Sequence, residues 1–369
     1  MAKKFKKHTY WLLRNVFRIV KHFEGTNSGV LNKDTVKRIL LVSTTALGDT
    51  LFSTPAIRAV RKNYPASHIA VMVHKRTQEI LKDNPYCDEL IIYKGKYKGL
   101  YFLLKTLRRR KFDLAIILHA NDPDIVPLIY ISGIPCRVGW AESKFAFLLT
   151  HTYTRPKSTM HLIPYRLAIA GSVGVCDDGC SMDMFLSDED KKDIQRYLEK
   201  NNITEKKYIG VHPFASHQSK QYDRFPELLN KALRVLDKAI FFVICGKKHA
   251  SLLEQYEKQI NEVGRRVFLI KGEFSIKQTA SLIERCGCFI STDSGPLHIA
   301  LALRVPVVVL SGQSDPQRTG PIGNNEYVLI HKDISCSPCD NRECLDNKCM
   351  KEIEPEEIIE AVKKLAYSG

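Results

Sequence analysis

The stretch "FISTDSGPLHIALALRVPVVVLSGQSDP", residues 289–316, contains the pattern that decides the fold. A short apolar run ends near Thr292, and a helical pattern begins around Pro296. Proline is favoured in the first turn of a helix, where the N–H that it lacks would have no partner in the helix. A second apolar run, "PVVVLSG", follows. Strand, polar turn, helix and strand in this order indicate a βαβ unit with parallel strands.

The same alternation runs through most of the chain. The apolar runs of the first half are "RILLVSTT", "HIAVMVH", "ELIIYK", "LAIILHA" and "CRVGW", and those of the second half are "KYIGVHPFA", "AIFFVICG", "RVFLIKG", "CFISTDSG" and "PVVVLSG". Continuous Val, Ile and Leu runs are typical of parallel strands that are covered on both faces. We therefore predict an α/β fold with two doubly wound, Rossmann-like domains, whose strand C-termini meet at a shared ligand-binding cleft.

The length of 369 residues also favours two domains, because it exceeds what one ordinary hydrophobic core supports. The chain becomes polar after Asp177 and then enters the charged helical pattern "DEDKKDIQRYLEK". The predicted organisation is an N-terminal amphipathic helix in residues 1–30, a first domain over 36–180, a second domain over 188–352, and a C-terminal helix over 354–367 that packs back on the first domain.

The composition, 44% hydrophobic and 26% charged, is that of a globular protein, but the net charge of +16 requires an anionic partner. Nucleic acid, an anionic membrane and a substrate rich in phosphates and carboxylates all qualify. No stacking motif or reading helix supports nucleic acid. Arg14 and Arg18 interrupt what would be the apolar core of a signal peptide, and no run reaches the roughly 18–20 residues that span a bilayer. Eleven cysteines without an export signal favour reduced thiols in a cytoplasm.

Two basic segments lie in the first third of the chain. On a helix, residues 11–23 place apolar side chains on one arc and cations on the other, which is typical of a helix in a membrane interface. Packing against the protein's own domain would give the same pattern. The segment Lys94–Asp113 contains eight cations before its first acid and includes a second amphipathic helical pattern. A solvated helix face is the alternative for this second segment, but the two segments together suggest one shared anionic target.

Two strand ends carry candidate site residues. Ser294 and Gly295 bring a hydroxyl and backbone N–H groups to the positive end of a helix, where a diphosphate fits. Asp293 beside them would hold sugar hydroxyls or fix the turn. Gly48–Asp49 ends the first strand, where a carboxylate could accept a proton from an attacking hydroxyl. The alternatives are an ordinary strand–helix turn at Asp293 and an N-cap role for Asp49.

The spacing of residues 293–321, D-S-G-P-x-H-I-A-x-A-L-x-V-P-V-V-x-L-x-G-x-[ST]-D-P-x-x-x-G-P, resembles the signature of glycosyltransferase family 9, the ADP-heptose:lipopolysaccharide heptosyltransferases. The segments "ILLVSTTALGDTLFSTPAIRAVRKNYP", "SGIPCRVGW" and "GVHPFASHQSKQYDRFPELL" are similar to three further family segments. The resemblance implies a GT-B fold, an inverting glycosyltransferase, ADP-heptose as the donor and no required metal. The implied acceptor is the Kdo/heptose-lipid A inner core of lipopolysaccharide, an anionic lipid-linked oligosaccharide.

The resemblance also implies roles for single residues. Asp49 matches the proposed general base, with Gly48 and Thr50 beside it near the acceptor. Lys220 matches a lysine that contacts the donor phosphates, and His298 is either a donor contact or a buried structural histidine. The remaining donor-binding positions are Asp293, Ser294, Gly295 and Pro296. An enzyme with this acceptor would be cytoplasmic and would associate peripherally with the inner membrane.

The sequence departs from the family pattern in the second half. Phe214 replaces the usual glycine and Tyr222 the usual tryptophan of one block. Cys245–Gln255 lacks the early acid that family members use to hold a ribose, since Glu254 comes later. These departures leave open a related glycosyltransferase with another acceptor, a protein or another glycan, or with another donor.

Four cysteines near the C-terminus follow the spacing C-x2-C-x4-C-x4-C. Four thiols so close in sequence could bind a structural zinc or iron ion in a tetrahedral site. Free thiols and a local disulfide are the alternatives, and we expect no part in catalysis. The four residues are Cys336, Cys339, Cys344 and Cys349.

Overall fold

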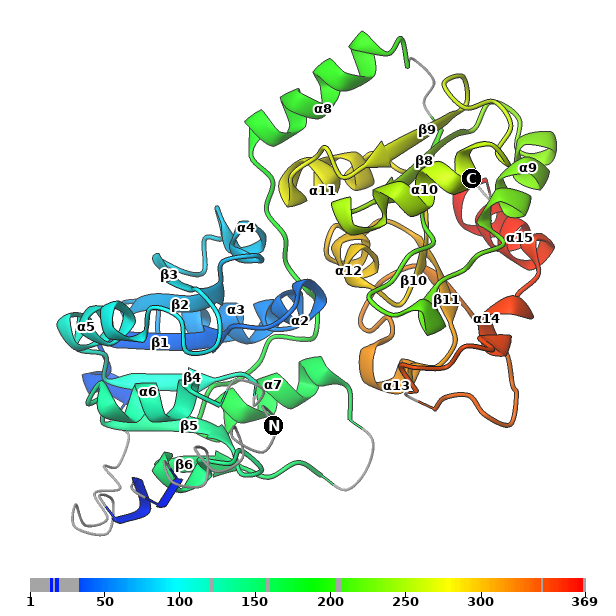
Figure 1. The fold of residues 1–369 in the computed structure, drawn as a ribbon. Coiled ribbons are helices and arrows are strands. Elements are labelled where there is room, and N and C mark those ends of the chain that lie inside the picture. The colour runs from blue at the N-terminus through cyan, green and yellow to red at the C-terminus, as the bar shows by residue number, and fades with distance from the viewer. Residues whose placement is uncertain are drawn as a thin grey trace. The chain divides into compact units, whose positions relative to one another are not determined.

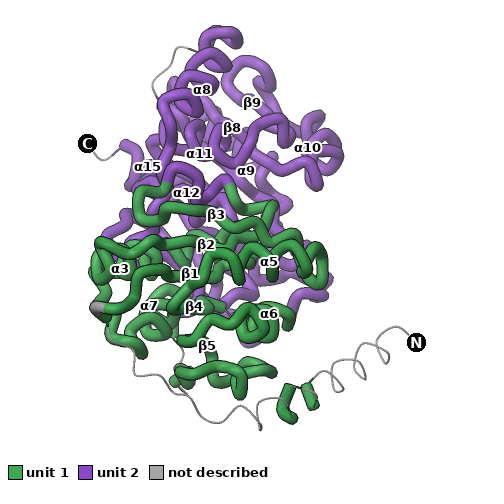
Figure 2. Tube along the Cα trace, turned by 90° about the vertical axis from the view of Figure 1, so that its left-hand side faces the viewer, with its two compact units in different colours: residues 1–78, 84–179 green, residues 79–83, 180–369 purple. Residues whose placement is uncertain are grey.

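The computed structural model describes residues 14, 15, 17–19, 33–119, 123–156, 160–203, 207–339 and 341–367 (Figure 1). The chain divides into two compact units (Figure 2). The first unit consists of residues 1–78 and 84–179, and the second of residues 79–83 and 180–369. None of the helices in the described ranges combines the length and the apolar character that a bilayer span needs.

The first unit is a parallel sheet with helices on both faces. Its strands are β1 (Arg38–Ser43), β2 (His68–His74), β3 (Glu89–Tyr93), β4 (Leu114–Ile117), β5 (Cys136–Trp140) and β6 (His151–Tyr153), in the order β3-β2-β1-β4-β5-β6. Helices α3 (Thr54–Asn63) and α7 (Leu162–Gly171) contact each other, as do α5 (Leu100–Arg110) and α6 (Ile125–Ile131). The short helices α2 (Leu47–Leu51) and α4 (Gln78–Leu81) follow β1 and β2.

The second unit repeats this arrangement. Its strands are β7 (Tyr208–His212), β8 (Ile240–Cys245), β9 (Val267–Lys271), β10 (Cys288–Thr292), β11 (Val307–Ser311) and β12 (Tyr327–His331), in the order β12-β11-β10-β7-β8-β9. Its helices are α8 (Asp188–Lys200), α9 (Phe225–Val235), α10 (Ala250–Glu257), α11 (Ile276–Glu284), α12 (Gly295–Ala302), α13 (Pro316–Thr319), α14 (Lys348–Lys351) and α15 (Pro355–Ala366). Numbered from its own first strand, each sheet has the order 3-2-1-4-5-6 of a doubly wound fold.

The predicted α/β class with two doubly wound sheets is therefore confirmed. The sequence analysis missed β6 and β12, which lie at sheet edges. In β12, Tyr327 and Leu329 are partly exposed to solvent, and β6 has only three residues. β6 shows no continuous apolar run, whereas β12 contains one over residues 327–330, which the sequence analysis overlooked.

The C-terminal helix α15 packs against the core of the second unit. The predicted packing of the C-terminal helix on the first domain differs from what the structure shows, because Ile358, Ile359 and Val362 of α15 belong to the core of the second unit. That helix contacts α9, whose amphipathic face offers the matching apolar surface.

The N-terminal helix predicted over residues 1–30 lies mostly outside the described residues. Within it, the Phe17 ring contacts Tyr130 and Phe145 edge-on, at centroid distances of 6.0 and 6.1 Å.

The order of the strands determines where a ligand is expected in each unit. In each sheet the chain reverses its winding direction between the first and fourth strands, which are β1 and β4 in one unit and β7 and β10 in the other. In open α/β sheets, ligands bind beyond the carboxyl ends of the strands at such a switch point. We therefore expect functional side chains in the loops that follow β1, β4, β7 and β10.

Gly210 in β7 tests the packing of the second sheet. A Cβ atom at this position would lie 2.3 Å from Cδ2 of Phe289 in the neighbouring strand β10. We expect Gly210→Ala to lower the free energy of unfolding by about 1–3 kcal/mol, the usual cost of overpacking a core. Urea denaturation would measure this loss. Gly171→Ala is the control, since Gly171 ends α7 and nothing lies within 4 Å of a Cβ built there. Equal stability of the two variants would contradict the packing described.

Candidate active site

In the second unit, the buried carboxylate of Asp293 gathers polar side chains from three segments. It follows β10, and its side chain is only 13% exposed. Lys220, from the loop after β7, donates to Oδ2 at 2.9 Å, and the Thr319 hydroxyl at the end of α13 donates to the same oxygen at 3.3 Å. Nε2 of His298, one turn into α12, lies 3.6 Å from Oδ1. The loops after β7 and β10 thus meet at the switch point of this sheet.

Asp293 is ionised in this cluster. Burial alone would raise the pKa of its carboxyl group, but the hydrogen bond from His298 and the positive charge of Lys220 together hold that pKa below its usual range. The Lys220 side chain is 21% exposed. An ammonium group has three N–H donors, so one bond to Asp293 leaves capacity for a second, anionic partner.

The beginning of α12 lies directly beside this pair. The helix starts at Gly295, one residue earlier than predicted, with Ser294 at the N-cap position and Pro296 in the first turn. The Ser294 side chain makes no cap hydrogen bond, and its hydroxyl lies 3.3 Å from that of Ser291. Ser294 therefore does not cap the first N–H groups of α12. A helix terminus binds an anion through N–H groups that are left without such a cap.

In the first unit, Asp49 lies on α2, just after β1. Ala46 occupies the N-cap position of α2, so the alternative that Asp49 caps this helix is wrong. Arg166 of α7 donates to the Asp49 carbonyl oxygen, and its Nη2 lies 2.8 Å from Oδ1 of the carboxylate. The Arg166 side chain is only 4% exposed, whereas that of Asp49 is 32% exposed. The buried cation therefore fixes a carboxylate that still faces solvent.

The residues next to the Asp49 carboxylate, Thr50 and Arg166, are buried. The ring of Phe52 lies 5.7 Å from Cζ of Arg166, a cation–π contact. Burial lowers the pKa of the Arg166 guanidinium, an effect that the charge of Asp49 opposes. Thr50 is fully buried and its hydroxyl donates to the Ala46 carbonyl at 3.0 Å, which favours a structural role for Thr50. Gly48 stands beside Asp49 in α2.

His119 connects the loops that follow β1 and β4 in the first unit by hydrogen bonds. It follows β4, and its Nε2 lies 3.1 Å from the backbone nitrogen and 2.9 Å from the hydroxyl of Thr44, which follows β1. Burial, reinforced by the charge of Arg166, lowers the pKa of His119 to about 3. The ring is thus neutral at physiological pH, and Nε2 accepts the Thr44 N–H.

The sequence analysis missed Arg166, Thr319 and His119. Arg166 did leave a signal, because it is a single cation within the apolar helical run "LIPYRLAIAG". A charged residue in such a run is almost never buried unless it is paired. Thr319 and His119 left no comparable signal, since their partners come from distant parts of the chain.

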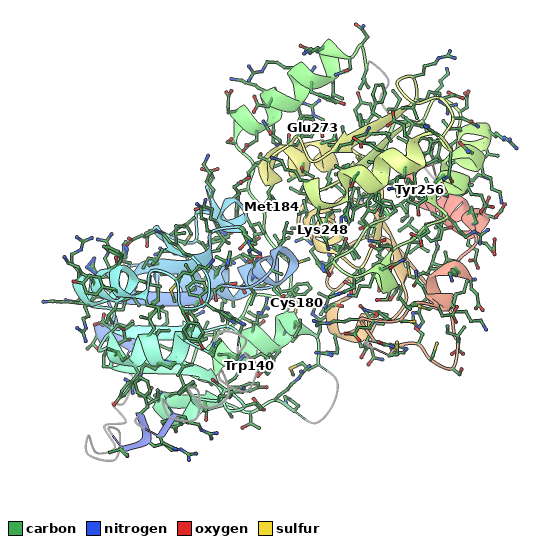
Figure 3. The ribbon with its side chains drawn as sticks, in the orientation of Figure 1. Trp140, Cys180, Met184, Lys248, Tyr256 and Glu273 are labelled. Carbon is green, nitrogen blue, oxygen red and sulfur yellow. The ribbon has the colours of Figure 1, made fainter. Side chains whose placement is uncertain are left out.

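Two of the departures from the family pattern belong to the core of the second unit. The Phe214 ring is buried and stacks on His249 at 5.3 Å, and the buried Tyr222 hydroxyl donates to the Ile353 carbonyl at 3.1 Å. Glu254 is 60% exposed and lies 3.9 Å from Lys271. Lys248, labelled in Figure 3, belongs to the segment Cys245–Gln255 that lacks the early acid, and it donates to the Ser216 carbonyl at 3.2 Å.

The four cysteines near the C-terminus do not form a metal site within the part of the chain that the structure describes. There, no group of three His, Cys, Asp or Glu side chains is arranged to hold a metal ion. Cys336 and Cys339 are exposed, Cys344 is half-buried and Cys349 is buried. The zinc or iron ion that this spacing could hold therefore has no support from the described residues, and no step of the chemistry is assigned to it.

The cysteine segment instead supports the loop that carries Lys220. The Cys339 backbone N–H donates to the Gln313 carbonyl at 3.0 Å. The Asn347 side chain donates to the Gln221 carbonyl at 3.0 Å, and the Ser219 hydroxyl lies 3.4 Å from the Arg342 carbonyl. The segment thus contacts both the loop after β11 and the short helix Gln218–Lys220.

Known proteins resemble this chain over nearly its whole length. It is 26% identical over 337 residues to the lipopolysaccharide heptosyltransferase 3 of Escherichia coli K12, which covers 86% of this chain and 95% of that protein. A crystal structure of a family 9 glycosyltransferase from Veillonella parvula matches with a TM-score of 0.78 at 25% identity, covering 92% of this chain and 99% of the other. The E. coli ADP-heptose lps heptosyltransferase II gives 0.72 at 21% identity, with 89% and 98% coverage.

The family model of glycosyltransferase family 9 (heptosyltransferase) matches residues 100–350. This range includes Lys220 and the whole cluster around Asp293, and it covers more than half of the chain. The doubly wound units agree with the fold of the solved relatives. The chain therefore belongs to glycosyltransferase family 9 (heptosyltransferase) and is a glycosyltransferase.

Proposed function

We propose that this enzyme transfers a heptose from ADP-heptose to the inner core of lipopolysaccharide, with inversion at the anomeric carbon. The observation that carries the proposal is the Lys220–Asp293 ion pair beside the uncapped start of α12, in a chain of this family. The E. coli relatives are named for heptose transfer to lipopolysaccharide, and one of them for ADP-heptose.

The donor would bind by its diphosphate. Lys220 supplies a cation that is already held in place by a buried carboxylate, and the first N–H groups of α12 supply aligned dipoles. As the bond between the sugar and the diphosphate breaks, negative charge grows on the leaving ADP. Lys220 and the helix terminus would stabilise that charge, which is larger in the transition state than in the bound donor. Asp293, oriented by His298 and Thr319, would accept hydrogen bonds from sugar hydroxyls.

Asp49 would act as the general base. Its carboxylate accepts the proton of the acceptor hydroxyl while the hydroxyl oxygen attacks the anomeric carbon and ADP departs. One displacement of this kind inverts the configuration at that carbon. Arg166 donates to the carboxylate and to the backbone carbonyl of Asp49, so the position of the base is fixed before substrate arrives. Such prior positioning lowers the entropic part of the barrier.

The proposed acceptor is anionic and therefore suits the positive net charge of the protein. A chain of net charge +16 is suited to an acidic sugar and a phosphorylated lipid. Because the acceptor is anchored in lipid, we infer that the enzyme works in the cytoplasm at the inner leaflet of the inner membrane. No metal or other cofactor has a part in this proposal.

A direct assay tests the proposed function. The purified full-length enzyme is incubated with ADP-heptose and a lipid A acceptor that carries Kdo, and products are followed by mass spectrometry and ADP release. The proposal predicts one added heptose per acceptor. Failure to bind or consume ADP-heptose with any core acceptor would overturn it.

A different acceptor or donor is the second candidate. It is favoured by Lys248 and the exposed Glu254 in the segment where relatives of this family hold a ribose. The same assay distinguishes the two, with a polypeptide acceptor, another glycan or another nucleotide sugar in place of the original substrate. Transfer to one of these, with lipid-linked core ignored, would establish the second candidate.

Asp49→Asn tests the general base. The amide keeps the shape of the side chain but cannot accept a proton, so kcat should fall at least about a hundredfold while donor affinity is unchanged. Steady-state rates and calorimetric titration with ADP would measure the two quantities. Asp188→Asn is the control, since Asp188 is an exposed residue in the first turn of α8 and its loss should leave kcat nearly intact. Near-normal turnover of Asp49→Asn would remove Asp49 from this role.

Asp293→Asn tests the buried charge cluster through the pH dependence of stability. Because folding lowers the pKa of Asp293, the stabilisation is fully present above the unfolded value of about 4 and is lost as pH falls toward the lower folded value. At pH 7 the variant should be less stable by about 3 kcal/mol, since Lys220 loses its buried partner. Urea denaturation between pH 7 and pH 3 should show this difference shrinking.

The control for that series is Glu360→Gln, which removes an exposed pair with Lys363. It should change the free energy of unfolding by less than about 0.5 kcal/mol. If the loss caused by Asp293→Asn were the same at pH 7 and pH 3, Asp293 would not be held ionised as described.

A further inference from the structure

The outward face of α5 combines exposed aromatic rings with cations. The helix buries Leu103 and Leu107 in the core of the first unit. At about 100° per residue, the opposite arc, roughly 120° wide, contains five side chains. These are Tyr101, Phe102, Lys105, Arg108 and Arg109, all of which are exposed.

The two aromatic residues of this arc are largely exposed to solvent. Tyr101 is 72% and Phe102 73% exposed, and their rings contact each other edge-on with centroids 5.5 Å apart. Tyr97, in the loop that leads into the helix, is 55% exposed. Large apolar side chains gathered at one exposed place usually mark an interaction surface.

The charge around these rings has one sign. From residue 90 to residue 112 the sequence contains no Asp or Glu, and it contains eight cations. Of these, Arg110 is paired with Glu89, at 2.5 Å. The neighbouring carboxylate of Asp124 accepts from the Tyr93 hydroxyl and the Tyr97 backbone N–H, so it is engaged inside the unit. The partner of this surface must therefore be anionic.

The described part of the N-terminal segment lies near the same face. Phe17 contacts Tyr130 of α6, and α6 packs against α5. Ile19 is 60% exposed, and Arg18 lies over the ring of Phe147 at 5.6 Å. Figures 1 and 2 both show this segment, α5 and α6 on one side of the first unit. The segment thus adds apolar and cationic side chains next to α6, the helix that packs against α5.

We propose that this face docks on an anionic lipid bilayer, with Tyr101 and Phe102 entering the boundary between headgroups and acyl chains. An aromatic ring with long cationic side chains on one helix face is suited to that boundary, because the rings leave water while the ammonium and guanidinium groups stay at the headgroups. A protein surface usually presents both signs of charge, whereas the charged groups on this arc are all cations.

Vesicle sedimentation with the full-length protein tests the docking surface. Wild-type protein should bind vesicles of phosphatidylcholine with phosphatidylglycerol and not vesicles of phosphatidylcholine alone. Binding should weaken as salt rises, since screening reduces the attraction of the cations. The double variant Tyr101→Ser/Phe102→Ser should bind the anionic vesicles at least about tenfold more weakly, because two buried rings are lost.

The matched control is Tyr327→Ser/Leu329→Ser, which removes two exposed apolar residues from edge strand β12 of the second unit. It should bind vesicles as wild type does. Wild-type affinity of the α5 variant would overturn the proposal. So would a change in its oligomeric state by ultracentrifugation without a change in vesicle binding, because a second copy of the chain would then be the partner.

A single variant covers the case in which the double variant does not fold. Phe102→Trp keeps the ring, and its added fluorescence should be quenched by brominated lipid in anionic vesicles. No quenching of this added signal would contradict the docking geometry. These measurements involve no sugar transfer, so their failure would leave the proposed reaction standing, and failure of the reaction would leave the docking surface standing.

Discussion

The ion pair between Lys220 and Asp293 is the interaction on which the candidate donor site depends. A carboxylate that is nearly removed from water is costly unless cations and hydrogen bonds compensate for the lost hydration. Lys220, His298 and Thr319 provide this compensation, and they come from three separate segments of the second unit. The fold must therefore bring the loops after β7 and β10 together before the charge is tolerated.

Each unit has an ion pair that includes a residue following its first strand, and the buried member of the pair differs between the units. In the first unit the buried partner is the cation, Arg166, and the carboxylate of Asp49 remains partly in solvent. In the second unit the buried partner is the carboxylate, Asp293, and the ammonium of Lys220 is the more exposed. One unit thus offers a fixed carboxylate to a hydroxyl that must lose a proton. The other offers a fixed cation to a phosphate, as the proposed reaction requires.

Much of the fold could be predicted because parallel strands buried on both faces produce continuous apolar runs. The runs at β2 and β5 coincide with the observed strands, whereas the three-residue edge strand β6 has no such run and was missed. Local spacing was sufficient to predict the turn at Asp293 between a strand and a helix. Arg166 could not be paired with Asp49, because the two lie far apart in sequence and only tertiary packing brings them together. The exposure of Tyr101 and Phe102 was equally hidden, since an amphipathic pattern does not show which apolar residues stay uncovered.

A crystal structure of the enzyme with ADP would test the central claim most directly. The account predicts that oxygens of the diphosphate lie about 3 Å from Nζ of Lys220 and from backbone nitrogens at the start of α12. A diphosphate bound elsewhere, with the Lys220–Asp293 pair and the α12 terminus untouched, would contradict it.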